Sequence, residues 1–265
     1  MRAAAALFTL LIVGAGPATL QAQTLARARA LYNSANYDAA ISAAEGLRTQ
    51  PAIADAAALV QARAHLDRYR INGDAADLSS ARDALSAVRP GMMAPRDQVD
   101  FFVGVAQSLY FTNEFGAAAD LFHTALERDA MLSHRDRMRL LDWWATALDR
   151  EAQASTPERR VRIAAQLSAR MQEELRMDPG SAPANYWLAV AAREAGDGEA
   201  AWDAAVAAWV RGAYGLYTTQ IRTDIDRLMT QAIIPQRVRS RPAREQVDAT
   251  EALLAEWETI KQQWK

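Results

Sequence analysis

Residues 177–210 read MDPGSAPANYWLAVAAREAGDGEAAWDAAVAAWV, and this stretch decides the fold of the chain. It opens with Asp178-Pro179, continues into an apolar segment, breaks at residues 196–198 and ends in an alanine-rich segment. Proline is tolerated in the first turn of a helix, and glycine commonly follows the end of one. The pattern therefore predicts two antiparallel helices joined by a short turn.

The same pattern recurs along the chain with a fixed spacing of alanines. Small residues allow two helices to approach closely where they cross, so we expect such alanines at the crossing point of a hairpin. Each pair brackets a predicted break, at residues 33–36, 112–114 and 196–198. The paired positions, 12 residues apart, are Ala28 and Ala40, Ala106 and Ala118, and Ala189 and Ala201.

Two further hairpins are predicted between these three, and both carry longer insertions. Ala62 lies 34 positions after Ala28, and its partner helix follows a break at residues 71–74. The other hairpin pairs Ala145 with Leu167 across a break at residues 153–157. Residues three or four positions apart share one face of a helix, which gives each segment an apolar stripe. The five predicted units span residues 25–50, 55–89, 98–128, 137–179 and 182–211.

These units resemble the tetratricopeptide repeat, a helix hairpin of about 34 residues. Asp178-Pro179, the Gly196-Asp197 turn and Ala201 carry the resemblance best, and the aromatic residue expected early in the first helix is clear only as Phe102. The resemblance implies an all-α fold, a right-handed superhelical array of about five antiparallel hairpins followed by a C-terminal capping helical segment. The alternative is a helical bundle without repeats.

The first 22 residues differ from the rest of the chain. Arg2 precedes an apolar run over residues 3–13, and Leu20-Gln21-Ala22 follows. This predicts a signal peptide cleaved after Ala22, because a membrane-spanning helix needs about 20 apolar residues. The chain contains no cysteine, so neither a disulfide nor a lipid-modified cysteine is available. We expect a periplasmic protein, with an uncleaved anchor in the inner membrane as the alternative.

The predicted domains are a signal peptide over 1–22, a repeat domain over 23–211 and a C-terminal helical cap with an arginine-rich linker over 212–265. Pro235 is expected to end a helix. The segment from Arg237 to Arg244 is then expected to be a solvated linker, with contact to an anionic partner as the alternative. The last helix carries Trp257 and Trp264, which either cap the end of the stacked repeats or dock into a partner.

The side chains that carry chemistry are sparse. The chain has three histidines, none at metal-ligand spacing from another, and no glycine-rich phosphate loop outside the first 22 residues. Carboxylate pairs such as Asp224 and Asp226 are common on helices and weigh little as evidence for glycoside hydrolysis. The net charge of −2 gives no reason to expect nucleic acid as a partner. We predict no enzymatic activity, no metal and no cofactor.

In arrays of the family that the chain resembles, the first helices of the hairpins line a concave groove. The resemblance implies that residues at fixed offsets from each first-helix alanine face a partner. Aromatic rings there would offer rigid contact area, and arginines would offer paired donors to carboxylates. The alternative is that these side chains pack against neighbouring repeats. The predicted partner-binding residues are Arg29, Tyr32, Asn33, Arg63, Gln107, Tyr110, Phe111, Asp149, Tyr186 and Arg193, and the same rule adds Leu25, Leu59, Leu66, Asp142 and Val190.

From the sequence we therefore expect a scaffold or assembly factor of the bacterial envelope that binds a peptide or helix of a protein partner. One alternative is an accessory protein that binds cell-wall or exopolysaccharide glycan. Another is an enzyme with an unrecognised helical active site. The sequence does not identify the partner.

Overall fold

A computed structural model describes residues 17–214 and 218–265 of the chain. These residues form helices joined by turns, and no strand occurs among them, which confirms the predicted all-α class. Most of the predicted signal peptide, residues 1–16, lies outside the described residues. The first helix, α1 (Pro17–Asn33), runs through Ala22. None of the described helices is both long enough and apolar enough to cross a membrane.

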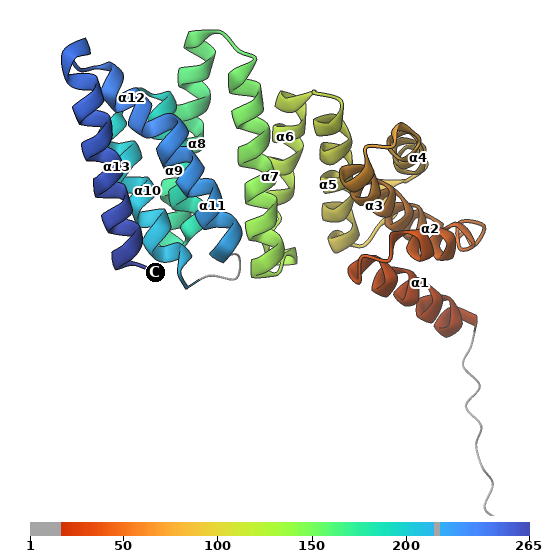
Figure 1. Ribbon diagram of the computed structural model, residues 1–265. Coiled ribbons are helices and arrows are strands. Elements are labelled where there is room, and N and C mark those ends of the chain that lie inside the picture. The colour runs from red at the N-terminus through yellow and green to blue at the C-terminus, as the bar shows by residue number, and fades with distance from the viewer. Residues whose placement is uncertain (1–16, 215–217) are drawn as a thin grey trace, which may run out of the picture. The chain divides into compact units, whose positions relative to one another are not determined.

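The helices form two compact units, the first ending at Asn113 and the second beginning at Glu114 (Figure 1). Within each unit, helices that follow one another in the chain mostly pack as neighbours. The first unit contains α1, α2 (Tyr37–Glu45), α3 (Ala54–Asn72), α4 (Ala75–Ser86), η1 (Pro90–Met92) and α5 (Pro95–Phe111). The second contains α6 (Phe115–Leu126), η2 (Asp129–Met131), α7 (His134–Gln153), α8 (Pro157–Met177), α9 (Ala182–Glu194), α10 (Gly198–Gly212), α11 (Thr218–Leu228), η3 (Met229–Ile233), α12 (Ile234–Arg239), η4 (Ala243–Glu245) and α13 (Gln246–Gln263).

The alanines that set the predicted spacing are all buried. Each has a relative solvent exposure of 0%. α1 packs on α2 and α9 packs on α10, as expected for two of the predicted hairpins. The third pair lies on α5 and α6, one residue in each unit. In the α1–α2 and α9–α10 hairpins, complete burial of so small a side chain fits a close helix crossing, because a larger residue would push the two backbones apart. The six residues are Ala28, Ala40, Ala106, Ala118, Ala189 and Ala201.

The turn that follows each first helix has the same backbone geometry in three places. Ala35, Asn113 and Gly196 lie seven positions after Ala28, Ala106 and Ala189, and their φ angles are 58°, 64° and 83°. The N–H of each turn residue donates to the carbonyl three positions earlier. The next helix begins two positions after the turn residue in all three cases, at Tyr37, Phe115 and Gly198. The recurrence thus extends from the sequence to the backbone conformation.

A buried polar network joins α3 to α4 in the first unit. Asp77 has a relative exposure of 2% and accepts a hydrogen bond of 2.7 Å from Nδ1 of His65. Nε of Arg68 donates to both carboxylate oxygens of Asp77, at 3.0 and 2.9 Å, and the same guanidinium also contacts Asp38 on α2. The Arg68 hydrogen bonds, and more weakly that of His65, lower the pKa of Asp77 to about 2 although burial opposes the charge.

The helix that Pro235 was expected to end continues past it, and that prediction is wrong. α11 passes into the π-helical turn η3, and Pro235 lies in the first turn of α12, which runs to Arg239. Proline lacks an N–H and clashes with the carbonyl four positions earlier in a regular α-helix. The π-turn changes the hydrogen-bond spacing directly before the proline, which lets the chain stay helical.

The arginine-rich segment is only partly the linker that we expected. Arg237 lies within α12, and its guanidinium carbon is 5.0 Å from the ring centre of Trp202 on α10. Arg241 and Arg244 are exposed beyond the helix, as expected of a solvated segment. The segment therefore begins as a packed helix and is exposed from Arg239 onward.

The last helix is packed through Trp257, which has a relative exposure of 0%. Its ring centre lies 5.2 Å from that of Trp209 and 6.4 Å from that of Trp202, both on α10. Its indole N–H donates to Oδ1 of Asp226 at 2.8 Å. Trp257 is therefore packed within the second unit, and its capping of stacked repeats stays a prediction. Trp264 follows the helix with a relative exposure of 40%.

Candidate functional site

The predicted residues of the first unit meet where α3 contacts both α1 and α5. Nη1 of Arg63 on α3 lies 2.8 Å from Oδ2 of Asp100 on α5. The Arg63 guanidinium carbon is 4.7 Å from the ring centre of Tyr32 on α1, and the Tyr32 hydroxyl donates to Oδ2 of Asp67 at 2.7 Å. Arg29 reaches from α1 to α5, where its Nη2 lies 2.8 Å from both oxygens of Asp97.

These contacts keep Arg63 charged. Burial lowers the pKa of its guanidinium, but the nearby Tyr32, Asp100 and Asp67 outweigh that effect and leave the pKa above its ordinary value. The side chains of Arg63 and Asp100 are 17% and 15% exposed, so water screens this pair less than it would on an open surface. The predicted residues Arg29 and Arg63 therefore join α1 and α3 to α5 through ion pairs with Asp97 and Asp100, which were not predicted.

The other predicted residues of the first unit have different surroundings. Phe111 packs against the core between α3 and α4, with its ring centre 4.9 Å from that of Tyr69. Tyr110 is half-buried, and its ring makes an edge contact with Phe111 at 5.9 Å. Gln107 is half-buried on α5, and Asn33 is exposed at the end of α1. Phe111 thus has the packing role that the sequence left open as an alternative.

A second set of predicted residues gathers in the other unit, where α9 contacts both α7 and α11. Tyr186 on α9 is half-buried. Oδ1 of Asp142 on α7 accepts the indole N–H of Trp187 at 2.9 Å, and Oδ2 of Asp149 accepts a bond of 2.7 Å from Gln153. In the described part of the chain, neither of these carboxylates forms an ion pair. We call Asp142, Asp149, Tyr186 and Asp224 the acidic face.

Burial and neighbouring negative charge raise the pKa values of Tyr186, Asp149 and Asp142. Burial is the largest cause for Tyr186, and Asp224, Asp149 and Asp142 add to it, which brings the pKa of the phenol to about 12. Burial likewise raises the pKa of Asp149, with a further contribution from the nearby Glu194. For Asp142, loss of hydration raises the pKa although the Trp187 bond opposes it. Asp224 pairs with Arg227 at 3.5 Å, whereas Asp142 and Asp149 have no such ion pair among the described residues.

Arg193 is the predicted arginine on α9, and its charge acts on Asp149 of this face. Its Nη2 pairs with the adjacent Glu194, and its charge lowers the pKa of Asp149 without offsetting the effect of burial. The backbone carbonyl of Arg193 accepts a hydrogen bond of 3.0 Å from Gln236 on α12. The end of α9 is therefore attached to the C-terminal segment.

Four of the additional residues that the offset rule placed in the groove are core residues, and that part of the prediction is wrong. Leu25, Leu59, Leu66 and Val190 have relative exposures of 7%, 2%, 1% and 5%. Leu25, Leu59 and Leu66 belong to the two core clusters of the first unit. Apolar side chains at these offsets are buried between helices, because removing them from water is favourable.

The sequence-based prediction missed three carboxylates that complete these two sets. Asp97 and Asp100 lie near the start of α5, before the positions that the rule considered. Asp224 lies on α11, outside the predicted repeats. A signal existed for it, because the stripe of Ile221, Ile225 and Leu228 already predicted a further helix after α10.

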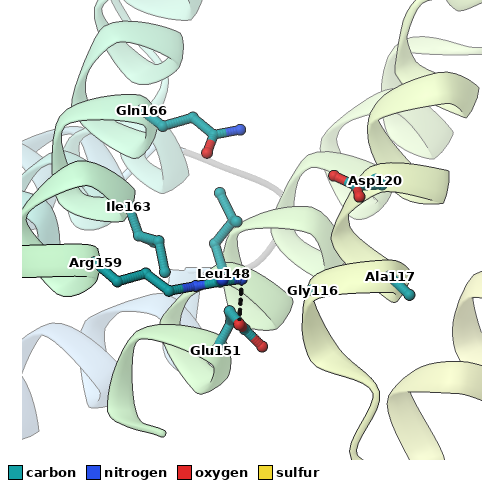
Figure 2. A pocket seen from close by; sticks show the side chains of 8 residues that line it. All are labelled: Gly116, Ala117, Asp120, Leu148, Glu151, Arg159, Ile163 and Gln166. Carbon is teal, nitrogen blue, oxygen red and sulfur yellow. Dashed lines mark ion pairs between the residues drawn. The ribbon is translucent and has the colours of Figure 1, made fainter. Parts of the chain in front are cut away.

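A separate pocket of about 280 Å³ lies among α6, α7 and α8 in the second unit (Figure 2). Figure 2 shows Glu151 and Arg159 joined across its floor, and their charged atoms are 2.6 Å apart. Leu148 and Ile163 supply the apolar part of the lining. None of the predicted binding residues lines this pocket. The remaining lining residues are Gly116, Ala117, Asp120 and Gln166.

The described residues contain no group of three or more histidines or carboxylates placed to hold a metal ion. What the acidic face offers is a set of hydrogen-bond acceptors beside a phenol ring. No model of a known protein family matches the chain, and searches of characterised proteins and of solved structures also find no match.

Proposed function

We propose that this protein is a non-enzymatic binding scaffold of the tetratricopeptide type that acts in the bacterial envelope. In this proposal the hairpins of α1–α2, α3–α4, α5–α6, α7–α8 and α9–α10 are five successive repeats in a right-handed superhelical array. The last helices cap the array. A peptide or helix of a protein partner binds to the first helices.

The observation that carries the proposal is the hairpin turn that recurs with one backbone geometry. Ala35, Asn113 and Gly196 adopt positive φ angles at the same position relative to the buried alanine of each first helix. A bundle without repeats has no reason to place the same left-handed turn at the same offset three times. Contacts between alternate helices, α1 with α3 with α5 and α7 with α9 with α11, further support stacking of first helices within each unit.

Charge complementarity favours a partner segment rich in lysine or arginine. Asp142 and Asp149 form no ion pair among the described residues, so no paired cation compensates either charge. A cation from a partner would supply that compensation, and Tyr186 would provide an aromatic contact at the centre of the face. The ion pairs of Arg29 and Arg63 in the first unit are already satisfied, which makes that surface less suited to the same role.

The test is capture of partners from an envelope extract by the full chain, compared with an Asp142→Asn, Asp149→Asn double variant. A matched control is Asp203→Asn, since Asp203 is an exposed carboxylate on α10 outside the acidic face. We expect the double variant to lose partners that the control retains. Labelled oligolysine and oligoglutamate peptides serve as defined probes, and only oligolysine should bind, with an affinity that falls as salt rises.

Two results would contradict the proposal. Capture and oligolysine binding that are identical in the double variant and the unaltered chain would exclude the acidic face. Retention on purified cell-wall material with no protein partner would instead favour the glycan-binding alternative.

Export is a part of the proposal that can be tested separately. Fractionation of cells that produce the full chain should place it in the periplasm. The amino-terminal sequence of the recovered protein should begin at Gln23 if cleavage follows Ala22. Recovery of the intact chain with the membrane fraction would favour the anchored alternative.

A further inference from the structure

The junction between α3 and α4 contains the dipeptide Asn72-Gly73. Asn72 is the last residue of α3 and is exposed. Gly73 has a φ of 70°, and a methyl group placed on its Cα would meet no other atom within 4 Å. The space on the side-chain face of Gly73 is therefore open.

The contacts of Asn72 orient its side-chain amide. Its Oδ1 accepts a hydrogen bond of 2.9 Å from the backbone N–H of Asp74. Its Nδ2 points to the buried carboxylate of Asp77, with 3.5 Å between Nδ2 and Oδ2. A hydrogen bond to the amide oxygen withdraws electron density from the amide carbon, which favours attack on that carbon by a nucleophile.

We propose that Asn72 is a site of spontaneous deamidation, and that the modification disturbs the Asp77 network. The backbone nitrogen of Gly73 attacks Cγ of Asn72 and loses its proton, and the side-chain nitrogen leaves as ammonia. The resulting succinimide ring is opened by one water molecule, which attacks either carbonyl and leaves an aspartyl or an isoaspartyl residue. The net reaction consumes one water and releases one ammonia.

The folded structure controls the rate of this reaction. The N–H of Gly73 donates to the carbonyl of Tyr69 at 2.7 Å, so the nitrogen is engaged while the last turn of α3 is intact. Attack requires that this turn open, and helix ends open more readily than helix interiors. Deamidation should therefore follow local opening at the end of α3 and should not require global unfolding.

The product changes the charge next to a buried carboxylate. Asn72 donates to Asp77, whereas a carboxylate at position 72 has no hydrogen to donate and repels Asp77. Asp77 links α3 to α4 through His65 and Arg68, so the repulsion acts on the contact between these helices. This inference concerns the first unit and does not depend on the proposed partner binding.

The experiment is incubation of the full chain at neutral to mildly alkaline pH, followed by peptide mapping and enzymatic detection of isoaspartate. Asn113 is the internal control, because it is also exposed in a turn but is followed by Glu114. We expect modification at Asn72 to accumulate several-fold faster than at Asn113, and Gly73→Ala to slow it. Equal rates at the two sites, or an intact Asn72 throughout, would overturn the proposed site.

A second measurement tests the proposed consequence. Asn72→Asp should lower the urea midpoint of unfolding relative to the unaltered chain, whereas Asn113→Asp should leave it nearly unchanged. Asn72→Gln retains an amide, cannot form the same five-membered ring readily, and should resist modification. An Asn72→Asp variant as stable as the unaltered chain would show that the Asp77 network does not sense the change.

Discussion

Replacing Ala35 by glycine should stabilise the first unit, although glycine usually destabilises helical proteins. Ala35 has a φ of 58°, in the left-handed region that glycine adopts without strain. Its side chain is exposed, so removing the methyl group costs little packing. The turn therefore contains backbone strain that a single substitution relieves.

The magnitude follows from two opposing costs. A residue with a Cβ in the left-handed region costs about 1–2 kcal/mol. Glycine costs about 0.5–1 kcal/mol through the greater freedom of the unfolded chain. The net stabilisation should be about 0.5–1 kcal/mol. Gly196 occupies the equivalent turn, and a Cβ there would meet nothing within 4 Å, so Gly196→Ala should destabilise through the backbone alone.

The assay is urea unfolding followed by circular dichroism, with Ala30→Gly as the matched control. Ala30 is exposed in the interior of α1, five positions before Ala35, and glycine there should destabilise by about 1 kcal/mol. The same chemical change should thus have opposite signs at the two positions. If Ala35→Gly destabilises as much as Ala30→Gly, residue 35 is not left-handed, and the recurrence of the turn that supports the repeat architecture is lost.

Three further predictions concern buried groups. The folded structure lowers the pKa of Asp77 from 3.8 to about 2, so the ionised carboxylate stabilises the fold above pH 3.8 and this stability is lost as the pH falls to 2. The contribution is about 2 kcal/mol. Asp77→Asn should therefore flatten this part of an acid unfolding profile. Trp257→Ala should cost about 3–5 kcal/mol in urea unfolding, because the side chain is completely buried, and a loss below 1 kcal/mol would contradict its capping role. Burial raises the pKa of Asp149, so the neutral carboxyl favours the folded state at low pH, and this advantage is lost as the pH rises through the raised value. Asp149→Asn should therefore raise the melting temperature at pH 7 and have little effect at pH 3. A lower melting temperature at pH 7 would refute this.

The sequence predicted helix packing well where one small residue determines it. Every alanine of the 12-residue spacing is completely buried, and the breaks at residues 33–36 and 196–198 coincide with turns. A close crossing tolerates little besides alanine, glycine or serine, so the position of such a residue in the sequence indicates where two helices cross.

Side-chain partners were harder to predict. Arg29 and Arg63 were expected to face a ligand, but they bind Asp97 and Asp100 from a helix that begins more than 30 residues after Arg63. An offset rule applied to one helix gives the direction of a side chain but not the charge that another helix brings to it. The continuation of the helix through Pro235 was missed because no signal in the sequence was used to predict the π-helical turn η3, whose Met229 and Ile233 are buried in the core.

The burial of Trp257 against Trp202 and Trp209 has a practical consequence for spectroscopy. All tryptophans of the chain lie after Glu114, so tryptophan emission reports only on the second unit, whereas far-ultraviolet circular dichroism reports on the helices of both. The close indole rings should also exchange excitation energy and give a near-ultraviolet signal of their own. If the two units unfold together, emission and ellipticity will follow one curve; if they separate, the midpoints will differ. Unfolding of the second unit can thus be followed without an added fluorophore, through Trp143, Trp144, Trp187, Trp202, Trp209, Trp257 and Trp264.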